Sequence, residues 1–309
     1  MRGRLRNAFR RLYGRLLERE VSGVPTHVAV IQDGNRRYAE EQGDEATAGH
    51  RAGADTTERV LEWCADLGVE ELTLYAFSTE NFERPPDERE ALFDLIAEKL
   101  RGFADRSEVH ERNVRIRAIG ETHRLPERVR EAIRYAEERT EGYDGLYLNV
   151  ALAYGGRAEL LGVARAIASE AAAGAIAPED VTVEEIESRL TVGPSRAVDL
   201  IIRTGGAERT SNFLPWHASG NEAAVYFCAP YWPEFSRIDF LRAIRTYESR
   251  RESWRRTRAQ RAAALVGAVS DVELTEAKRI VGQFRGTVPN VDGEDDTVEG
   301  REESGSSAG

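Results

Sequence analysis

The side chains best suited to chemistry come directly after an apolar run near the N-terminus. That run spans residues 26–32 and leads toward a helix through Asp33, Gly34, Asn35, Arg36 and Arg37. A glycine lets backbone N–H groups approach phosphate oxygens, and arginine offers them forked donors. A carboxylate suits a hard cation such as Mg²⁺. The segment predicts a diphosphate site with a magnesium ion, and a solvated turn is the alternative interpretation.

Two further polar segments end other apolar runs in the same way. Residues 77–85 read FSTENFERP, which fits either a binding loop with two aromatic side chains or ordinary loop capping. Residues 203–212 read RTGGAERTSN, where paired glycines flanked by arginines favour a phosphate site over a plain turn. If the preceding runs are parallel strands, all three segments converge at the carboxyl edge of one sheet. This convergence predicts a site for an anionic ligand.

The elements that must hold these segments alternate along the chain. Strands are expected at 26–32, 71–77, 114–120, 146–154, 199–205 and 223–229. Helices are expected near 50–67, 88–112, 126–140, 157–173 and 183–190, with a long helix near 237–264. This alternation is typical of a parallel sheet covered on both faces. The predicted fold class is α/β, with a mainly parallel central sheet of about six strands flanked by helices.

The composition excludes several classes of protein. The chain has 309 residues, of which 41% are hydrophobic, enough for a substantial core. No apolar run is long enough for a membrane-spanning helix. The net charge of −11 argues against nucleic acid as the main partner. The histidines lack zinc-site spacing, and Cys64 and Cys228 form no CxxC pair, which fits a reducing cytosol.

The basic residues are almost all arginine. Of 43 lysines and arginines, only Lys99 and Lys278 are lysine. An acidic, arginine-rich surface suits solubility at high salt, and codon bias in a GC-rich genome gives the same composition. Both interpretations fit a halophilic archaeon. Under the first, the protein should unfold at low salt and recover in concentrated KCl.

Five stretches occur in a telling order: HVAVIQDGNRRYAEEQG (27–43), GHRAG (49–53), LTLYAFSTENFERP (72–85), LNVALAYGGRAEL (148–160) and DLIIRTGGAERTSNFLPW (199–216). Together with ASGNEAAVYFCAPYWPEF (218–235), they resemble the signature regions of the cis-prenyltransferases, the undecaprenyl diphosphate synthase family. The resemblance implies a homodimer that uses Mg²⁺ to condense isopentenyl diphosphate repeatedly onto an allylic diphosphate. It also implies the undecaprenyl diphosphate synthase-like fold, with an apolar tunnel.

The resemblance carries roles over to residues of this sequence. Asp33 would hold magnesium on the allylic diphosphate and promote its departure, and Glu222 would complete the metal site. Asn81 matches the position usually assigned to proton removal, although a neutral amide is better suited to orienting groups while a diphosphate oxygen takes the proton. The residues expected at the allylic diphosphate are Gly34, Asn35, Arg36, Arg37, Tyr38 and His50. Those expected at isopentenyl diphosphate are Arg203, Arg209, Thr210 and Ser211, and those expected in the substrate loop are Ser78, Thr79, Glu80, Phe82 and Arg84.

Two departures from the family pattern affect these assignments. Ala46 stands four residues before His50, where many bacterial members have an arginine. One diphosphate contact is therefore missing, or it is supplied by Arg36 or Arg51. The segment around Glu222 is longer than usual, which weakens its assignment as a metal ligand.

The lipid tail of such a product requires an apolar channel. Each buried CH₂ group contributes about 0.8 kcal/mol, so a five-carbon unit contributes roughly 4 kcal/mol. Small Ala76 near a strand end leaves room for the tail. The helix near 88–103 is the predicted wall, unless its apolar residues are simply core: Leu92, Phe93, Leu95, Ile96, Leu100 and Phe103.

The two ends of the chain differ from the catalytic domain expected at 21–283. Residues 1–20 read as a basic amphipathic helix, which suits either an anionic membrane surface or packing on its own domain, and they lack the apolar region of a secretory signal. Residues 284–309 read as a disordered acidic tail, and the glycines around its acidic stretch argue against a helical metal-binding box. The expected localisation is cytoplasmic, at the inner face of the cell membrane if residues 1–20 dock there.

The resemblance thus predicts an archaeal-type cis-polyprenyl diphosphate synthase. The predicted primer is geranylgeranyl diphosphate, with farnesyl diphosphate second, and the predicted product is a long chain such as tritrans,polycis-undecaprenyl diphosphate, a precursor of the glycosyl carrier lipid. One alternative is a non-catalytic partner subunit of a heteromeric enzyme. Such subunits typically lose the aspartate and the arginines, which this chain keeps as Asp33, Arg37, Arg203 and Arg209. A phosphate-binding regulatory module would leave the apolar helix unexplained.

Overall fold

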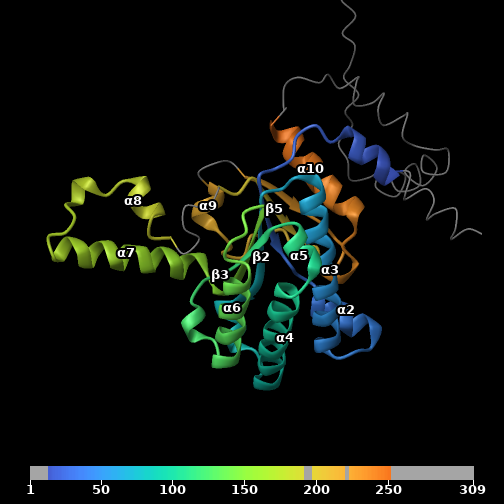
Figure 1. The fold of residues 1–309 in the computed structure, drawn as a ribbon, viewed down its shortest axis with the longest axis horizontal. Helices are drawn as coiled ribbons and strands as arrows, with labels where there is room; N and C mark the ends of the chain where they lie inside the picture. The colour runs from blue at the N-terminus through green and yellow to red at the C-terminus, as the bar shows by residue number, and fades with distance from the viewer. Residues whose placement is uncertain (1–12, 191–196, 220–222, 252–309) are drawn as a thin grey trace, which may run out of the picture. The chain divides into compact units, whose positions relative to one another are not determined.

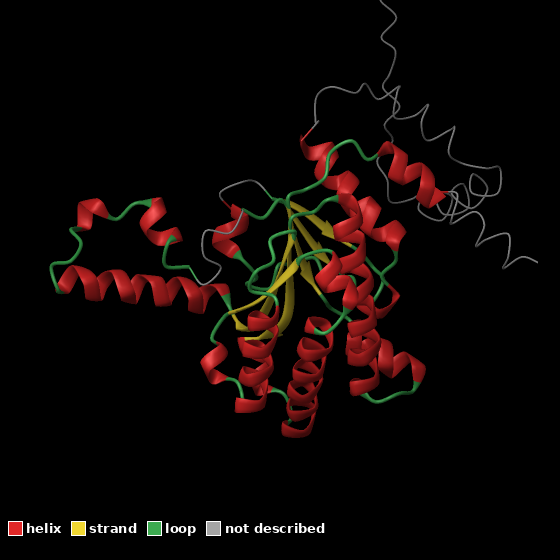
Figure 2. Ribbon diagram, viewed as in Figure 1, coloured by secondary structure: helices red, strands yellow, loops and turns green. Residues whose placement is uncertain are grey.

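A six-stranded parallel sheet forms the centre of the computed structural model, which describes residues 13–190, 197–219 and 223–251. The strand order is β3-β4-β2-β1-β5-β6, and Figure 2 shows the strands surrounded by helices. All neighbouring strands pair in parallel, which confirms the predicted fold class. The strands are β1 His27–Ile31, β2 Glu71–Ser78, β3 Val114–Ile119, β4 Leu146–Tyr154, β5 Leu200–Arg203 and β6 Ala224–Phe227.

Helices follow the strands as the alternation predicts. The helix expected after Gly34 is α2, and α7 leads away from the sheet toward α8 (Figure 1). Short 3₁₀ turns lie at Thr79–Glu83 (η1), Thr122–Arg124 (η2), Pro178–Asp180 (η3) and Trp232–Glu234 (η4). The helices are α2 Asn35–Gln42, α3 Ala46–Leu67, α4 Pro86–Ala104, α5 Ser107–Glu111, α6 Glu127–Arg139, α7 Gly156–Ala172, α8 Val183–Glu187, α9 Pro215–Ser219 and α10 Arg237–Arg251.

Both faces of the sheet are buried. Successive side chains of a strand point to opposite faces, so each strand contributes to the core on either side. In β1, Val28 and Val30 belong to a core shared with α3, α4 and α6. Ala29 and Ile31 belong to the opposite core, where Tyr75 stacks on Phe213 with their ring centroids 4.4 Å apart. A strand that is covered on both faces has apolar residues at nearly every position, which explains the continuous apolar run at 26–32.

One predicted helix is interrupted. The run expected near 88–112 is divided into α4 and α5, because Arg106 adopts an extended backbone. The Arg106 guanidinium pairs with Glu58 of α3 and lies 5.7 Å from the centroid of the Phe103 ring. The pair with Glu58 is a tertiary contact with a neighbouring helix, so periodicity within the segment does not reveal the break.

The described part of the N-terminal basic helix packs on the protein itself. Residues 13–20 are helical, and Leu17 is buried. Glu18 pairs with Arg237 and Glu20 with Arg245, both on α10. Packing on its own domain, one of the two interpretations of this helix, therefore holds for residues 13–20.

Some expectations fall outside the described residues. These are the first half of the N-terminal helix, the end of the long helix beyond Arg251, the acidic tail at 284–309, and Glu222. Within the described ranges, no helix is both long and apolar enough to cross a bilayer.

Candidate active site

Asp33 and Arg203 meet at the carboxyl ends of the paired strands β1 and β5. Arg203 Nη2 donates to Asp33 Oδ2 at 2.7 Å, and Arg37 Nη2 lies 3.3 Å from Asp33 Oδ1. Thr204 Oγ1 donates to the Asp33 carbonyl at 2.7 Å. The Arg203 side chain is 4% exposed, whereas Asp33 keeps 29%. Segments 170 residues apart thus form one rim, as the convergence of strand ends predicts.

The glycine pair after β5 shapes the backbone of this rim. Gly205 has φ +78°, and a Cβ atom there would lie 2.7 Å from Arg37 Nη2. Glycine is therefore required both for the turn and for the approach of the arginine. The N–H groups of Gly205 and Gly206 donate to backbone carbonyls in the segment 228–232. Because these two amides are already bonded, they are not available to a phosphate group.

Arg203 also organises the loop that follows it. Its Nη1 atom donates to the backbone carbonyl of Arg209 at 2.6 Å and to the Ser211 hydroxyl. The side chains of Arg209 and Thr210 are exposed. The predicted isopentenyl diphosphate residues therefore lie together on one short loop, with two of their side chains facing solvent.

The second predicted loop joins this rim at Gly155, directly after β4. A Cβ atom on Gly155 would lie 2.7 Å from Thr79 Oγ1 and 3.4 Å from Asn212 Nδ2. The Arg157 N–H donates to Asn212 Oδ1 at 2.8 Å. The turn at 154–157 lies within one of the family-like stretches but was not among the predicted site residues. Its glycines allow the loops that follow β2 and β5 to approach each other.

Asn81 holds the backbone of the predicted substrate loop. Its Oδ1 atom accepts the Ser78 N–H at 2.8 Å, which caps the turn η1. Arg89 Nη1 donates to the Phe82 carbonyl at 3.0 Å, and the Arg124 guanidinium lies 4.4 Å from the centroid of the Phe82 ring. Neither arginine is among the predicted site residues. Arg89 contacts a loop carbonyl and Arg124 contacts a ring, and neither contact shows in a sequence motif.

His50 connects α3 to the same loop. Its Nε2 atom lies 3.8 Å from Glu88 Oε1, and Glu88 is bonded to Arg84. Burial lowers the pKa of His50 to about 4, with the positive charge of Arg84 and, more weakly, of Arg36 acting in the same direction and Glu88 opposing it. His50 is therefore neutral at pH 7, and the charged groups that act on it are Arg84 after η1, Glu88 on α4 and Arg36 on α2.

The remaining predicted residues lie on or near α2. Asn35 Oδ1 is buried without a hydrogen-bond partner among the described residues, and a Cβ atom on Gly53 would lie 2.2 Å from it. The exposed Arg36 lies 3.4 Å from Glu40, and Tyr38 is half-buried. Asn35 thus presents an unsatisfied acceptor beside the rim, whereas Arg36 faces solvent.

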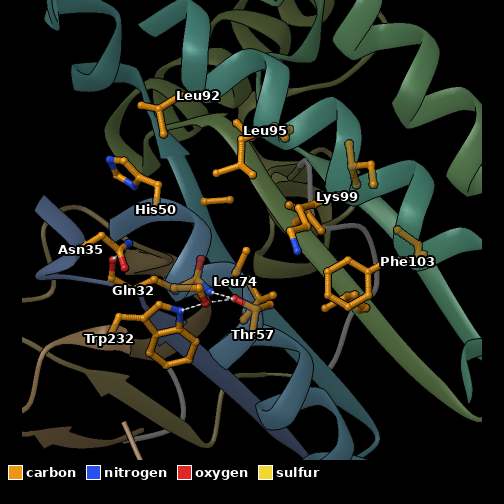
Figure 3. A pocket seen from close by; sticks show the side chains of 18 residues that line it. Gln32, Asn35, His50, Thr57, Leu74, Leu92, Leu95, Lys99, Phe103 and Trp232 are labelled. Carbon is orange, nitrogen blue, oxygen red and sulfur yellow. Dashed lines mark hydrogen bonds between the residues drawn. The ribbon is translucent and has the colours of Figure 1, made fainter. Parts of the chain in front are cut away.

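An apolar cavity of about 120 Å³ lies beside this rim, between α3, α4 and the sheet (Figure 3). Gln32, Asn35 and His50 line one end of it. Phe93 of the predicted wall does not line the cavity and instead lies against the Phe77 and Phe82 rings. The other predicted wall residues do line it, as does Ala76: Leu92, Leu95, Ile96, Leu100 and Phe103.

Three polar side chains that border the cavity already have partners, whereas Asn35 Oδ1 and His50 Nε2 at one end have no hydrogen-bond partner among the described residues. Lys99 Nζ lies 3.3 Å from Glu58 Oε1, and Gln32 Nε2 donates to Thr57 Oγ1 at 2.6 Å. Trp232 Nε1 donates to the Gly53 carbonyl at 2.7 Å. Because these groups are paired, an apolar guest need not satisfy them. The cavity is therefore suited to a hydrocarbon chain.

The donor chemistry at the rim suits a magnesium ion that also binds diphosphate. Asp33 supplies a carboxylate that remains partly exposed. No group of three or more acidic, histidine or cysteine side chains forms a metal cage within the described ranges. Mg²⁺ typically takes one or two protein carboxylates and completes its shell with substrate phosphates and water. A single aspartate between arginines fits that mode.

Residues 31–255 match the family model described as "Putative undecaprenyl diphosphate synthase", so the match covers most of the chain. The chain belongs to the undecaprenyl diphosphate synthase family.

Two relatives come from salt-loving archaea, which fits the source suggested by the composition. The chain is 67% identical over 290 residues to a protein of Halobacterium salinarum named tritrans,polycis-undecaprenyl-diphosphate synthase (geranylgeranyl-diphosphate specific), covering 94% of this chain and 96% of the relative. A protein of the same name from Haloarcula marismortui is 63% identical over 282 residues, covering 91% and 93%.

A solved structure shares the fold. It is the lavandulyl diphosphate synthase of Lavandula x intermedia in complex with dimethylallyl diphosphate. The TM-score is 0.67 at 31% sequence identity, and the match covers 72% of this chain and 95% of that chain. The resemblance inferred from the motifs is thus confirmed by sequence and by fold.

Proposed function

We propose that this protein is a cis-polyprenyl diphosphate synthase. It condenses isopentenyl diphosphate repeatedly onto an allylic diphosphate and makes a new cis double bond at each step. The observation that carries the proposal is the position of Asp33, Arg37 and Arg203 at one rim beside an apolar cavity. This arrangement offers cations to a diphosphate and apolar surface to its hydrocarbon tail.

The rim residues assist cleavage of the allylic C–O bond. Cleavage leaves an allylic cation and a diphosphate that carries additional negative charge. Arg37 and the backbone around Gly34 are fixed beside the position of the leaving group, so charge develops where donors already point. Asp33 would hold Mg²⁺ against the same diphosphate, and the metal would stabilise the departing oxygen.

The loop after β5 binds the second substrate. Arg203, Arg209, Thr210 and Ser211 hold the diphosphate of isopentenyl diphosphate, whose double bond attacks the allylic cation. The new tertiary cation then loses a proton. A diphosphate oxygen accepts it, and Asn81 orients the reacting groups by fixing the loop that starts at Ser78.

The missing family arginine at Ala46 is compensated by its neighbours. Arg84 is bonded to Glu88, which lies 3.8 Å from His50, and Arg36 follows Asn35 at the start of α2. Arg84 and Arg36 thus supply positive charge near His50, where Ala46 supplies none. Arg51, the other sequence-based candidate, follows His50 directly on α3.

The tail of the growing product extends from the rim into the cavity between α3 and α4. The preferred primer is geranylgeranyl diphosphate, supported by the names of the archaeal relatives, and the product is a polyprenyl diphosphate of undecaprenyl length. The enzyme acts as a homodimer in the cytoplasm, and the basic segment at 1–20, of which residues 13–20 pack on α10, brings it to the membrane that accepts the lipid. Glu222, which lies outside the described residues, would supply the second carboxylate to the metal.

Product analysis tests this proposal. Purified protein is incubated with radiolabelled isopentenyl diphosphate and Mg²⁺ together with geranylgeranyl, farnesyl or dimethylallyl diphosphate. We expect a long-chain product, formed fastest with the geranylgeranyl primer. The absence of long-chain product with every primer would overturn the enzymatic function and favour a non-catalytic subunit.

A further inference from the structure

Tyr231 lies where the two rim loops are tied together. It belongs to the segment 228–232, which follows β6. The Trp232 N–H donates to the Asp33 carbonyl at 3.0 Å, and the Pro230 carbonyl accepts the Gly205 N–H at 2.7 Å. The backbone on either side of Tyr231 is therefore bonded to both loops. This fixes where the Tyr231 side chain can lie.

The Tyr231 ring lies against the first loop and its arginine. A Cβ atom on Gly34 would lie 2.5 Å from Tyr231 Cδ1, so the ring packs directly on the glycine backbone. The Arg37 guanidinium carbon lies 5.2 Å from the ring centroid, within cation–π range. The Tyr231 hydroxyl donates to Glu41 Oε1 at 2.6 Å. One side chain thus contacts Arg37 through its ring and Glu41 through its hydroxyl.

The hydrogen bond between Tyr231 and Glu41 matters because of where Glu41 lies relative to Arg37. Glu41 follows Arg37 by four residues on α2, a spacing at which acidic and basic side chains pair. The adjacent pair, Arg36 and Glu40, has the same spacing and forms an ion pair at 3.4 Å. Glu41 instead bonds to the tyrosine hydroxyl, and Arg37 is directed toward Asp33.

We propose that Tyr231 is a positioning residue that keeps the charge of Arg37 available to the allylic diphosphate. This inference rests on the proposed function. The ring attracts the guanidinium without neutralising it, and the hydroxyl occupies the carboxylate that would otherwise pair with it. If Asp33 binds a magnesium ion, Arg37 loses a partner, and the ring would still hold it at the rim.

Binding of the primer without turnover tests this role. The full chain is titrated calorimetrically with geranylgeranyl diphosphate and Mg²⁺ in the absence of isopentenyl diphosphate, at the lowest salt that keeps it folded. Tyr231→Phe keeps the ring but frees Glu41, so we expect the primer to bind about twofold more weakly, the equivalent of one exposed ion pair on a helix. Tyr231→Leu also loses the ring, and we expect about fivefold weaker binding.

The decisive variant is Tyr231→Phe combined with Glu41→Gln. Removing the carboxylate should restore wild-type affinity to Tyr231→Phe, a rescue that a purely structural role of the tyrosine does not produce. Glu41→Gln alone should bind the primer like the wild type, and isopentenyl diphosphate should bind all variants equally. Wild-type primer affinity in Tyr231→Leu, or no rescue by Glu41→Gln, would overturn the role of Tyr231. Failure of the wild type to bind any allylic diphosphate would instead overturn the proposed function, and this inference with it.

Discussion

The rim and the cavity adjoin each other, yet they are built in opposite ways. At the rim, Asp33 and Arg203 are held by direct hydrogen bonds, and Gly205 is required by its positive φ and by the approach of Arg37. The cavity is lined mainly by aliphatic and aromatic side chains of two helices and the sheet, and its bonded polar side chains pair with the protein itself, as Gln32 does with Thr57 and Trp232 with the Gly53 carbonyl. A charged head group needs fixed partners, whereas a hydrocarbon tail needs only apolar surface and space.

This contrast leads to different expectations for substitutions. Changes at the rim should alter the rate by orders of magnitude, because one lost donor or ligand removes stabilisation of the leaving group. Changes in the cavity should alter product length while the first condensation continues. The following experiments test this division.

Asp33→Ala should have the largest effect. It removes the carboxylate that we assign to magnesium and to Arg203, and we expect kcat to fall by about 10²–10³. The measurement is radiolabelled product formation at saturating substrates, with the melting temperature recorded to show that the variant is folded. Asp44→Ala removes an exposed carboxylate just beyond α2 and should leave kcat unchanged. A folded Asp33→Ala enzyme with wild-type activity would refute the metal assignment.

Asn81→Asp should have the next largest effect. Aspartate keeps the oxygen that accepts the Ser78 N–H, so the loop should retain its shape. It replaces an amide donor with a negative charge beside two diphosphates, and we expect kcat to fall about 10–100-fold with little change in KM. The full kcat and KM of this variant with geranylgeranyl diphosphate provide the measurement. Undiminished activity would remove the orienting role that we assign to the amide.

The boundary between rim and cavity can be probed by pH. The pKa of His50 is lowered to about 4 in the folded protein, from 6.5, mainly because the ring is buried. The unfolded chain therefore binds this proton more readily, and stability is lost as pH falls from 6.5 toward 4. The contribution is about 1.4 kcal/mol per pH unit.

His50→Gln removes this contribution. Chemical unfolding at several pH values should show a smaller loss of stability on acidification in His50→Gln than in the wild type. The exposed His123→Gln is the matched control and should leave the pH dependence unchanged. An identical pH dependence in wild type and His50→Gln would show that burial does not lower the pKa of His50.

Ala76→Leu should have the smallest effect on rate. The added methyl groups occupy part of the cavity, so we expect shorter products while the first condensation proceeds at close to the wild-type rate. Overpacking costs about 1–3 kcal/mol, which the melting temperature will show. Chromatography of the dephosphorylated products gives chain length, and the exposed Ala173→Leu serves as control. Unchanged product length would show that the growing tail does not pass through the cavity at Ala76.

Sequence alone predicted the sheet and the convergence of its loops. The six apolar runs are strands because a parallel strand is buried on both faces, and the polar segments after 26–32 and 199–205 meet because strand ends share an edge. Five of six residues expected in the apolar wall line the cavity, since helical spacing places them on one face.

Other features could not be predicted, because they depend on contacts between distant segments. The break before α5 reflects the pairing of Arg106 with Glu58. The bonding of Gly205 and Gly206 amides to the segment 228–232 removes them from phosphate binding, although paired glycines suggest the opposite. The placement of Tyr231 on Arg37 likewise joins residues far apart in the chain.

The most direct measurement is a crystal structure of the protein with geranylgeranyl diphosphate and Mg²⁺. We expect the diphosphate within hydrogen-bond distance of Arg37, with the metal bound by Asp33 and the hydrocarbon tail between α3 and α4 against Leu95 and Leu100. A tail on the opposite face of the sheet, near Phe213, or a diphosphate remote from Asp33 would contradict the assignment of head to rim and tail to cavity.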